Sequence, residues 1–315
     1  MKTAVLCSHP FAFPAIELLS NTGTLVGLGA PQKEGLTPDI TALANHAFVP
    51  LSKIEDDNGK SIQAWFELTR PDVVFVMGFP FLIPEHLLEL PQHGFFNFHT
   101  GILPDYRGID PIFWQIRNRE SFGGITVHKM DGGLDTGPIA LIEKTEILPY
   151  ETYGLHLHRL SFSTREAAAK MMAKLSENRL ELSEQIHSVQ NYQERPGFED
   201  LLIRWESENA KSIKALVQAS NPSYGGAGTF YKGSYLRITE VSIHKKHTPP
   251  GTMPGTIVAT EDSLYILCVD GKSIGIDIIY TDAGLFTGKT FVQAFDVTEG
   301  GTISDKQFPD MAEAI

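Results

Sequence analysis

Residues 72–100, DVVFVMGFPFLIPEHLLELPQHGFFNFHT, decide the fold class of this chain. The apolar segments DVVFVMG and GFFNFHT predict two buried strands, and HLLELP between them predicts a short helix. Strands that are apolar throughout and alternate with helices are typical of a parallel sheet covered on both faces. In such sheets ligands bind beyond the carboxyl ends of the strands, and both MGFPFLIP and the residues after His99 lie there.

The residues before this stretch repeat the same alternation. Two further apolar segments, TAVLC at 3–7 and TLVGLGA at 24–30, predict strands. Helices are predicted at 13–21, 38–46 and 60–69, where apolar residues recur at helical spacing. The first half of the chain is therefore predicted to be a Rossmann-like α/β domain with a mostly parallel sheet.

The second half of the chain has a different pattern. A helical pattern covers 152–187, and the polar segment NYQERPGFED that follows it contains a Pro-Gly pair, which favours a linker. Another helix is predicted at 207–219, beginning near Ser207. Beyond it, short apolar segments separated by the turn signals YKGS, ATEDS and VDGKS predict a small antiparallel barrel or sandwich. The predicted organisation is a first domain at 1–190, a linker at 191–206 and a second domain at 207–315.

The composition argues against several classes of protein. The formal net charge is −12, whereas a broad nucleic-acid-binding surface clusters Lys and Arg. No run of about eighteen apolar residues predicts a membrane span, and the N-terminus lacks the pattern of a signal peptide, so we expect a cytoplasmic protein without a membrane partner. Cys7 and Cys268 stand alone in apolar segments, so they predict reduced core thiols and no metal site.

Asn97 and His99 are the first candidate site residues. They are two positions apart on a predicted strand, so their side chains point to the same face. The strand is otherwise apolar, and a polar pair that emerges from it needs hydrogen-bonding partners or a ligand. For His99 alone, a satisfied core histidine stays an alternative. The adjacent loop with glycine and proline favours a ligand site.

A second segment, GGITVHKMDGGLDTGPIAL at 123–141, carries the acidic candidates Asp131 and Asp135. Its loop DGGLDTG can expose backbone N–H groups to a ligand, although a plain Asp-Gly turn stays an alternative. An aspartate can orient a neighbouring imidazole, and an asparagine amide can stabilise an oxyanion. Asn97, His99 and one of these aspartates together therefore suit acyl-type transfer through a tetrahedral intermediate. No P-loop or GxGxxG motif occurs, and the GxSxG match GKSIG at 271–275 falls at the turn signal VDGKS among the predicted short strands rather than between a strand and a helix, so we expect direct transfer to an incoming nucleophile.

Several stretches resemble the folate-dependent formyltransferases. NFHTGILPDYRG resembles that family's Asn-x-His…Leu-Pro-x-Tyr-Arg-Gly stretch, and GGITVHKMDGGLDTGPI resembles its Gly-x-Thr-x-His…Asp-x-Gly stretch. VVFVMGFPFLIP is similar to the segment that lines the family's pterin pocket. SHPFAFPAIELL and LLIRWESENAKSIKALVQASNPSYGGAGTFYKGSYLRI resemble the methionyl-tRNA formyltransferase branch, in which a linker leads into an OB-like β-barrel.

The resemblance implies an enzyme that transfers a formyl group from 10-formyltetrahydrofolate to an amine without a metal. It implies that Asn97 and His99 hold the formyl oxygen, and that Asp135 orients His99 and relays the proton of the amine. The cofactor-binding residues that it implies are Met77, Gly78, Phe79, Leu82, Asp131, Gly132, Gly133 and Leu134. The loop expected to border the acceptor contains Thr100, Gly101, Tyr106 and Arg107.

Two departures from the family pattern bear on the acceptor. Thr100-Gly101 replaces the usual Pro-Ser, and APQKEGLTPD at 30–39 replaces a long basic insertion of the tRNA-specific branch. We therefore predict a small-molecule or carrier-bound amine, for example a nucleotide-linked amino sugar, and keep methionyl-tRNA as the alternative. A tRNA partner is possible but not favoured, and the chain is expected to be a monomer or a dimer. A formyltetrahydrofolate hydrolase and an inactive folate-binding protein are further alternatives.

Overall fold

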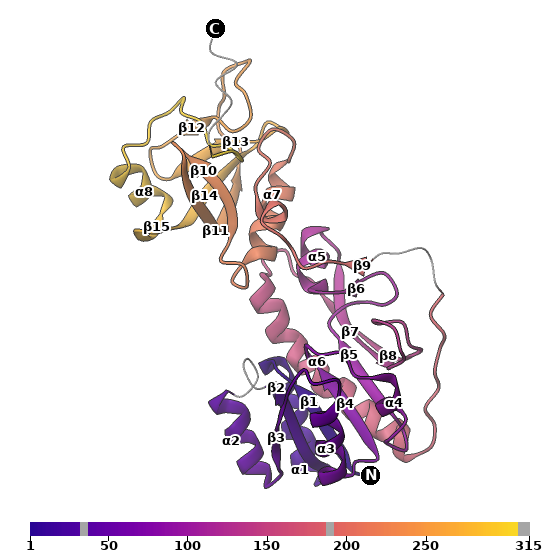
Figure 1. The fold of residues 1–315 in the computed structure, drawn as a ribbon. Helices are drawn as coiled ribbons and strands as arrows, with labels where there is room; N and C mark the ends of the chain where they lie inside the picture. Colours follow the sequence, from indigo (N-terminus) through magenta and orange to yellow (C-terminus); the bar gives the residue numbers. More distant parts are fainter. Residues whose placement is uncertain (32–36, 187–191, 308–315) are drawn as a thin grey trace. The chain divides into compact units, whose positions relative to one another are not determined.

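The computed structural model describes residues 1–31, 37–186 and 192–307. Contacts divide the chain into two compact units, whose elements are labelled in Figure 1. This division groups two internal segments with the C-terminal part of the chain. It does not test the predicted domain limits, which stay a prediction. Unit 1 comprises Met1–Pro111, Phe122–Glu146 and Leu157–Glu194, and unit 2 comprises Ile112–Ser121, Ile147–His156 and Arg195–Ile315.

A seven-stranded sheet forms the centre of unit 1, in the order β3-β2-β1-β4-β5-β7-β8. The first five strands in this order run parallel, while β7 and β8 are antiparallel additions at one edge. The predicted Rossmann-like, mostly parallel sheet is thereby confirmed. The strands span Thr3–Cys7 (β1), Leu25–Pro31 (β2), Leu51–Ile54 (β3), Val73–Met77 (β4), Phe95–His99 (β5), Phe122–Lys129 (β7) and Ile139–Glu146 (β8).

The strand order creates a reversal point beside β1, where ligands bind in open α/β sheets. The strands β2 and β4 flank β1, and Cys7 at its end pairs with Met77 at the end of β4. Val76 of β4 in turn pairs with Asn97 of β5, the next strand in the sheet. The residues after Met77 and after His99 therefore leave the sheet at the same edge, as the sequence predicts.

The predicted helices alternate with these strands, with local differences. Helix α5 (Pro111–Arg117), which lies mostly in unit 2, was not predicted from the sequence. The helix predicted over 152–187 ends at Ser176, because Asn178 adopts a φ of 52°, a left-handed conformation that terminates helices. The sequence prediction also missed β3, an edge strand in which only Ile54 is fully buried. The helices span Phe13–Asn21 (α1), Pro38–Ala47 (α2), Lys60–Thr69 (α3), Glu85–Leu88 (α4), Pro111–Arg117 (α5) and Tyr153–Ser176 (α6).

Unit 2 contains a curled antiparallel sheet in the order β10-β11-β14-β13-β12, with β15 paired to β14. This confirms the predicted small OB-like domain. Helix α7 (Ala210–Ser220) begins later than predicted, because Asn209 rather than Ser207 caps it by accepting a hydrogen bond from the Ser212 N–H at 3.0 Å. The other elements are β10 (Ala227–Tyr231), β11 (Ser234–His244), β12 (Ile257–Ala259), β13 (Leu264–Leu267), β14 (Ser273–Thr281), β15 (Gly284–Thr287) and α8 (Gly288–Ala294).

Across the described ranges, no helix combines the length and the apolar character that crossing a membrane requires.

Candidate functional site

A polar patch lies on one face of the sheet where β5 pairs with β7. The antiparallel register places Asn97 opposite His128, and His99 opposite Thr126. Side chains at directly paired positions share a face, so these four residues lie together. The side chains of His99, His128 and Thr126 are buried, and that of Asn97 is half-buried. Polar groups at this depth need partners, because their desolvation is otherwise uncompensated.

The loop between β7 and β8 brings Asp135 onto this patch. Asp135 Oδ1 accepts a hydrogen bond from Asn97 Nδ2 at 3.2 Å and lies 3.3 Å from His128 Nε2. Its Oδ2 accepts a hydrogen bond from the Gly108 N–H at 3.0 Å. The structure therefore brings together Asn97, His99 and Asp135, the three predicted catalytic residues, and adds contacts from His128 and Gly108.

Opposing influences act on the pKa of Asp135. Burial raises this pKa, whereas the charge of His99, hydrogen bonds from His128 and the Gly108 N–H, and the charge of His128 lower it. The lowering influences together exceed the effect of burial, so the pKa of Asp135 lies well below its usual range. Asp135 is thus an ionised acceptor at neutral pH, able to hold donors in place.

Both ring nitrogens of His99 face oxygen atoms. Nε2 lies 2.5 Å from the Tyr106 carbonyl oxygen, and Nδ1 lies 3.6 Å from Asp135 Oδ2. The first contact is a hydrogen bond, while the second is longer than a hydrogen bond. Catalytic hydrogen bonds are often long before substrate binds. In this state the Tyr106 carbonyl, more than the Asp135 carboxylate, fixes the imidazole ring.

The conformation of the β7–β8 loop determines where Asp135 lies. A Cβ atom at Gly137 would lie 1.8 Å from the Lys129 carbonyl oxygen, so only glycine allows this close approach. Asp131 Oδ1 accepts a hydrogen bond from Thr136 Oγ1 at 2.6 Å and so closes the loop on itself. Asp135 has a φ of 54°, a left-handed conformation in which aspartate is enriched among non-glycine residues.

Sequence reasoning missed Thr126 and His128 as members of this site. Thr126 Oγ1 donates to the Gly101 carbonyl at 2.6 Å and accepts from the Leu103 N–H at 3.1 Å, so it anchors the loop after β5. The signal was available in ITVHKM, where the two polar side chains occupy alternate positions of a strand. The same two-residue spacing had already identified the pair on β5.

The predicted cofactor-binding residues lie in two adjoining loops at this edge. Met77 is fully buried, so only its backbone could meet a ligand, whereas Leu82 is 81% and Leu134 46% exposed. The loops approach each other where a Cβ at Gly132 would lie 3.4 Å from the Glu85 carboxylate. Exposed apolar side chains beside a polar loop suit a flat ligand with one apolar face. The remaining predicted residues in these loops are Gly78, Phe79, Asp131 and Gly133.

The predicted acceptor loop is packed more tightly than its sequence suggests. Gly101 has no room for a side chain, because a Cβ there would lie 2.8 Å from His99 Nε2. Arg107 is 6% exposed, and its guanidinium Nη2 donates to Gln185 Oε1 at 2.6 Å. Both positions therefore shape the site from within. The half-buried residues of this loop include Thr100 and Tyr106.

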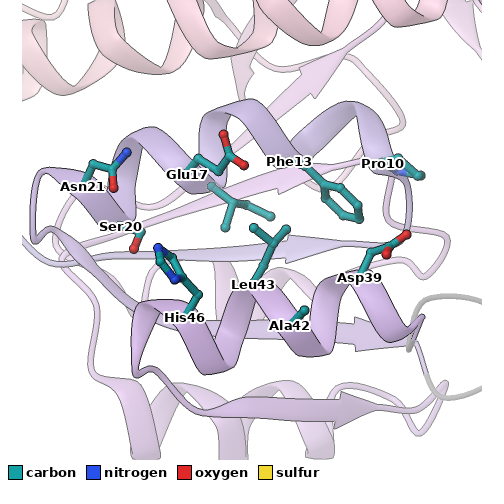
Figure 2. A pocket seen from close by; sticks show the side chains of 10 residues that line it. Pro10, Phe13, Glu17, Ser20, Asn21, Asp39, Ala42, Leu43 and His46 are labelled. Carbon is teal, nitrogen blue, oxygen red and sulfur yellow. The ribbon is translucent and has the colours of Figure 1, made fainter.

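A separate groove of about 710 Å³ lies between α1 and α2 (Figure 2). Phe13 and Leu43 contribute apolar side chains to it, and Glu17, Asp39 and His46 contribute polar ones. None of the residues that line this groove belongs to the polar patch around Asp135. The candidate site is therefore identified by side-chain geometry rather than by the size of a cavity.

The patch combines an amide donor, an imidazole and an ionised carboxylate at the edge where ligands bind. Such groups stabilise a developing oxyanion and move a proton. Among the residues that the structure describes, no group of three or more His, Cys, Asp or Glu side chains is arranged to hold a metal ion. An amide donor, an imidazole and an ionised carboxylate in this arrangement suit acyl-type transfer.

Two family models match this chain. The model described as formyl transferase matches residues 16–174, and the model described as formyl transferase, C-terminal domain, matches residues 198–293. The matches fall in both halves of the chain, and the first includes Asn97, His99 and Asp135.

Individual relatives match over most of their length. The chain is 33% identical over 282 residues to a methionyl-tRNA formyltransferase of Thermotoga maritima, covering 86% of this chain and 88% of that one. It is 29% identical over 313 residues to a methionyl-tRNA formyltransferase of Alkaliphilus oremlandii, covering 96% and 97%. A crystal structure of an N-formyltransferase from Helicobacter canadensis, in complex with folinic acid and dTDP-3-aminofucose, matches with a TM-score of 0.68. Its identity is 16%, over 88% of this chain and 98% of that one, which establishes a common fold.

Proposed function

Because this chain belongs to the formyl transferase family and is a folate-dependent N-formyltransferase, we propose that its acceptor is the primary amine of a small or carrier-bound molecule. The proposed donor is 10-formyltetrahydrofolate. The observation that carries the proposal is the contact of the Asp135 carboxylate with Asn97 and His99 at the ligand-binding edge of the sheet. These groups match the needs of direct formyl transfer.

The proposed reaction is a single displacement at the formyl carbon. The amine nitrogen attacks this carbon, and the formyl oxygen gains negative charge in a tetrahedral intermediate. The Asn97 amide and the His99 imidazole stabilise that oxygen, as donors in an oxyanion hole do. Asp135 accepts the proton that the amine loses and passes it to N10 of the folate as the bond from carbon to N10 breaks. The products are a formamide and tetrahydrofolate, without a covalent enzyme intermediate.

The loops that follow β4 and β7 are the proposed binding site of the folate. Exposed Leu82 and Leu134 offer apolar surface for one face of the pterin. The Leu134 carbonyl is held by the Tyr192 hydroxyl at 3.0 Å, so this part of the loop is fixed in place. The backbone of residues 131–135 then supplies polar groups to the edge of the ring, as peptide groups commonly do in ligand sites.

The proposed acceptor class is based on the charge of this chain. The segment 30–39 carries one lysine and two acidic residues, and the whole chain has a net charge of −12. Residues 32–36 of this segment lie outside the described residues. A small amine, for example on a nucleotide-linked sugar, places less demand on basic surface than tRNA does. The alternative acceptor, methionyl-tRNA, is favoured by relatives of that name that match nearly the whole chain.

We expect release of tetrahydrofolate from 10-formyltetrahydrofolate only when an amine acceptor is present. The measurement is the absorbance change on donor turnover with a panel of nucleotide-linked amino sugars, amino acids and charged tRNA. A nucleotide-linked amino sugar is expected to give the highest rate. Turnover with methionyl-tRNA alone would support the alternative acceptor. Equal release without any amine would indicate a hydrolase, and folate binding without turnover would indicate an inactive binding protein.

Binding of initiator tRNA is expected to be weak, with a Kd above about 1 μM at physiological salt, because the net charge of the chain is −12 and the segment 30–39 carries a single lysine. The measurement is a fluorescence anisotropy titration of labelled tRNA at several salt concentrations. The slope of log Kd against log salt reports the number of phosphate contacts. A submicromolar Kd with a steep salt dependence would contradict the proposed acceptor class and leave the catalytic proposal intact.

A further inference from the structure

Gln185 is a buried polar residue beside the candidate site that the sequence analysis did not identify. Its side chain is 5% exposed, and it lies in the segment that follows α6. Ser183, two residues earlier, forms an antiparallel bridge with Ile139 at the start of β8. This bridge directs the segment along the β7–β8 loop that carries Asp135.

The Gln185 amide uses its full hydrogen-bonding capacity. Its Nε2 donates to the Asp135 carbonyl at 3.0 Å and to the Gly137 carbonyl at 2.7 Å. Its Oε1 accepts from Arg107 Nε at 3.1 Å and from Arg107 Nη2 at 2.6 Å. A primary amide has two donors and two acceptor positions, so all four are occupied. This orientation of the amide is the one in which every contact joins a donor to an acceptor.

These four bonds connect the two loops that form the site. Arg107 begins the two-residue strand β6 (Arg107–Gly108) in the segment after β5, and the two carbonyls belong to the loop after β7. The same loops also meet where the Gly108 N–H donates to Asp135 Oδ2. One connection therefore acts on the backbone of Asp135 and the other on its carboxylate.

The backbone connection matters because Asp135 has a φ of 54°. Left-handed conformations of residues other than glycine are unfavourable and persist where surrounding contacts impose them. A hydrogen bond to the carbonyl of Asp135 itself, and another two residues later, impose the conformation. If this backbone were free to rotate, the Asp135 carboxylate would contact Asn97 and His99 in a smaller fraction of the molecules.

We propose that Gln185 is a positioning residue for formyl transfer, because its amide ties the backbone of Asp135 to Arg107 and so holds the Asp135 carboxylate on Asn97 and His99. This inference rests on the proposed function for its kinetic test. The depressed pKa of Asp135 agrees with it, since donors must remain close to the carboxylate for that shift to persist.

The length of the glutamine side chain and its hydrogen-bonding groups determine which substitutions test this role. Methionine has a similar length but lacks hydrogen-bonding groups of comparable strength. Glutamate keeps acceptors for Arg107 but has no donor for the two carbonyls when ionised. Gln185→Met therefore removes all four bonds, and Gln185→Glu removes the two that act on the loop of Asp135. The second variant keeps the buried contact to Arg107 and is the safeguard if the first fails to fold.

Steady-state formyl transfer by both variants is the first measurement. We expect kcat to fall by about 10- to 100-fold and the KM of the folate donor to change less than about threefold, because displaced catalytic groups affect mainly the transition state. Gln63→Met, at an exposed glutamine on α3, is the matched control and should retain wild-type kcat. A kcat within threefold of wild type in Q185E, or in folded Q185M, would overturn the proposal.

Combining the variants with Asp135→Asn tests whether Gln185 acts through Asp135. In the D135N background Q185E should cause no further loss of kcat, because residues that act as a unit are strongly non-additive. Full multiplication of the two losses would indicate an independent structural role and overturn the proposal.

A measurement without turnover separates this inference from the proposed function. Carbon-13 NMR of labelled aspartate carboxyls should show the pKa of Asp135 below the usual range in the wild type and closer to it in folded Q185M, which adds no charge beside Asp135. An unchanged titration of Asp135 would overturn the positioning role, whatever the activity. If no acceptor is formylated but the pKa of Asp135 rises in folded Q185M, the proposed function fails and the positioning of Asp135 by Gln185 stands.

Discussion

Replacing Asp135 by asparagine is expected to lower the rate of formyl transfer by about 10³- to 10⁴-fold, as in other sites where an aspartate supports a histidine. The substitution preserves size, and asparagine also tolerates the left-handed backbone of this position. It removes a negative charge that contacts Asn97, His99, His128 and the Gly108 N–H. Hydrogen-bond donors face both carboxylate oxygens of Asp135. In either orientation of the new asparagine side chain, its NH₂ group would therefore face a donor and could not accept a hydrogen bond from it. Single-turnover transfer, with folate binding followed by fluorescence, measures the effect.

Folate binding should change less than about threefold in this variant, because the charge contributes to the transition state rather than to donor binding. Asp56→Asn, at an exposed aspartate between β3 and α3, is the matched control and should transfer at the wild-type rate. A D135N rate within threefold of wild type would rule out the proposed role of the carboxylate.

The same variant has a consequence for stability that follows from the sign of the pKa shift. The pKa of Asp135 is lower in the folded chain than in the unfolded chain, so its ionised form stabilises the fold above the unfolded pKa. This contribution is lost as the pH falls through the depressed folded value. At neutral pH D135N should therefore unfold at lower denaturant concentration than wild type, and the difference should shrink in strong acid.

The pair Asn97 and His99 could be predicted from local sequence, whereas Asp135 could not. Two polar residues at alternate positions of an apolar strand share a face in any register. An aspartate in the next loop reaches them only if that loop folds back, and Asp131 and Asp135 looked equivalent by composition. The structure shows the difference: Asp131 bonds to Thr136 within its own loop, and Asp135 bonds to Asn97. The family resemblance, rather than spacing, had identified Asp135.

Contacts between distant segments account for what the sequence did not reveal. His128 enters the site because it pairs with Asn97, and this register depends on the whole β5–β7 pairing. Gln185 lies 50 residues beyond Asp135, in a segment that the periodic pattern had assigned to a helix. The helix ends earlier because Asn178 turns left-handed, and the helical pattern continues past that point without a glycine or a proline to mark it.

Removing the Asn97 amide is expected to lower kcat by about 10²- to 10³-fold, the effect of deleting one oxyanion donor in other acyl-transfer sites. Among the polar patch residues, Asn97 is half-buried while His99, Thr126 and His128 are buried, so its amide is the most accessible to a formyl oxygen. In Asn97→Ala the hydrogen bond from the Gly108 N–H to the Asp135 carboxylate remains, so the carboxylate keeps one donor. The KM of the folate donor should change less than about threefold, because the oxyanion exists only in the transition state.

Asn97→Asp tests the same amide by charge rather than by truncation. Asn97 Nδ2 lies 3.2 Å from Asp135 Oδ1, so a carboxylate at this position would face a second carboxylate. Like charges at this distance force one group to keep a proton, which raises the pKa of the pair. N97D should therefore be less active than N97A at neutral pH, and its deficit should shrink as the pH falls and a shared proton replaces the repulsion. Asn45→Ala, at an exposed asparagine on α2, is the control. A deficit of N97D that is independent of pH, together with an N97A rate near wild type, would place the oxyanion donor elsewhere.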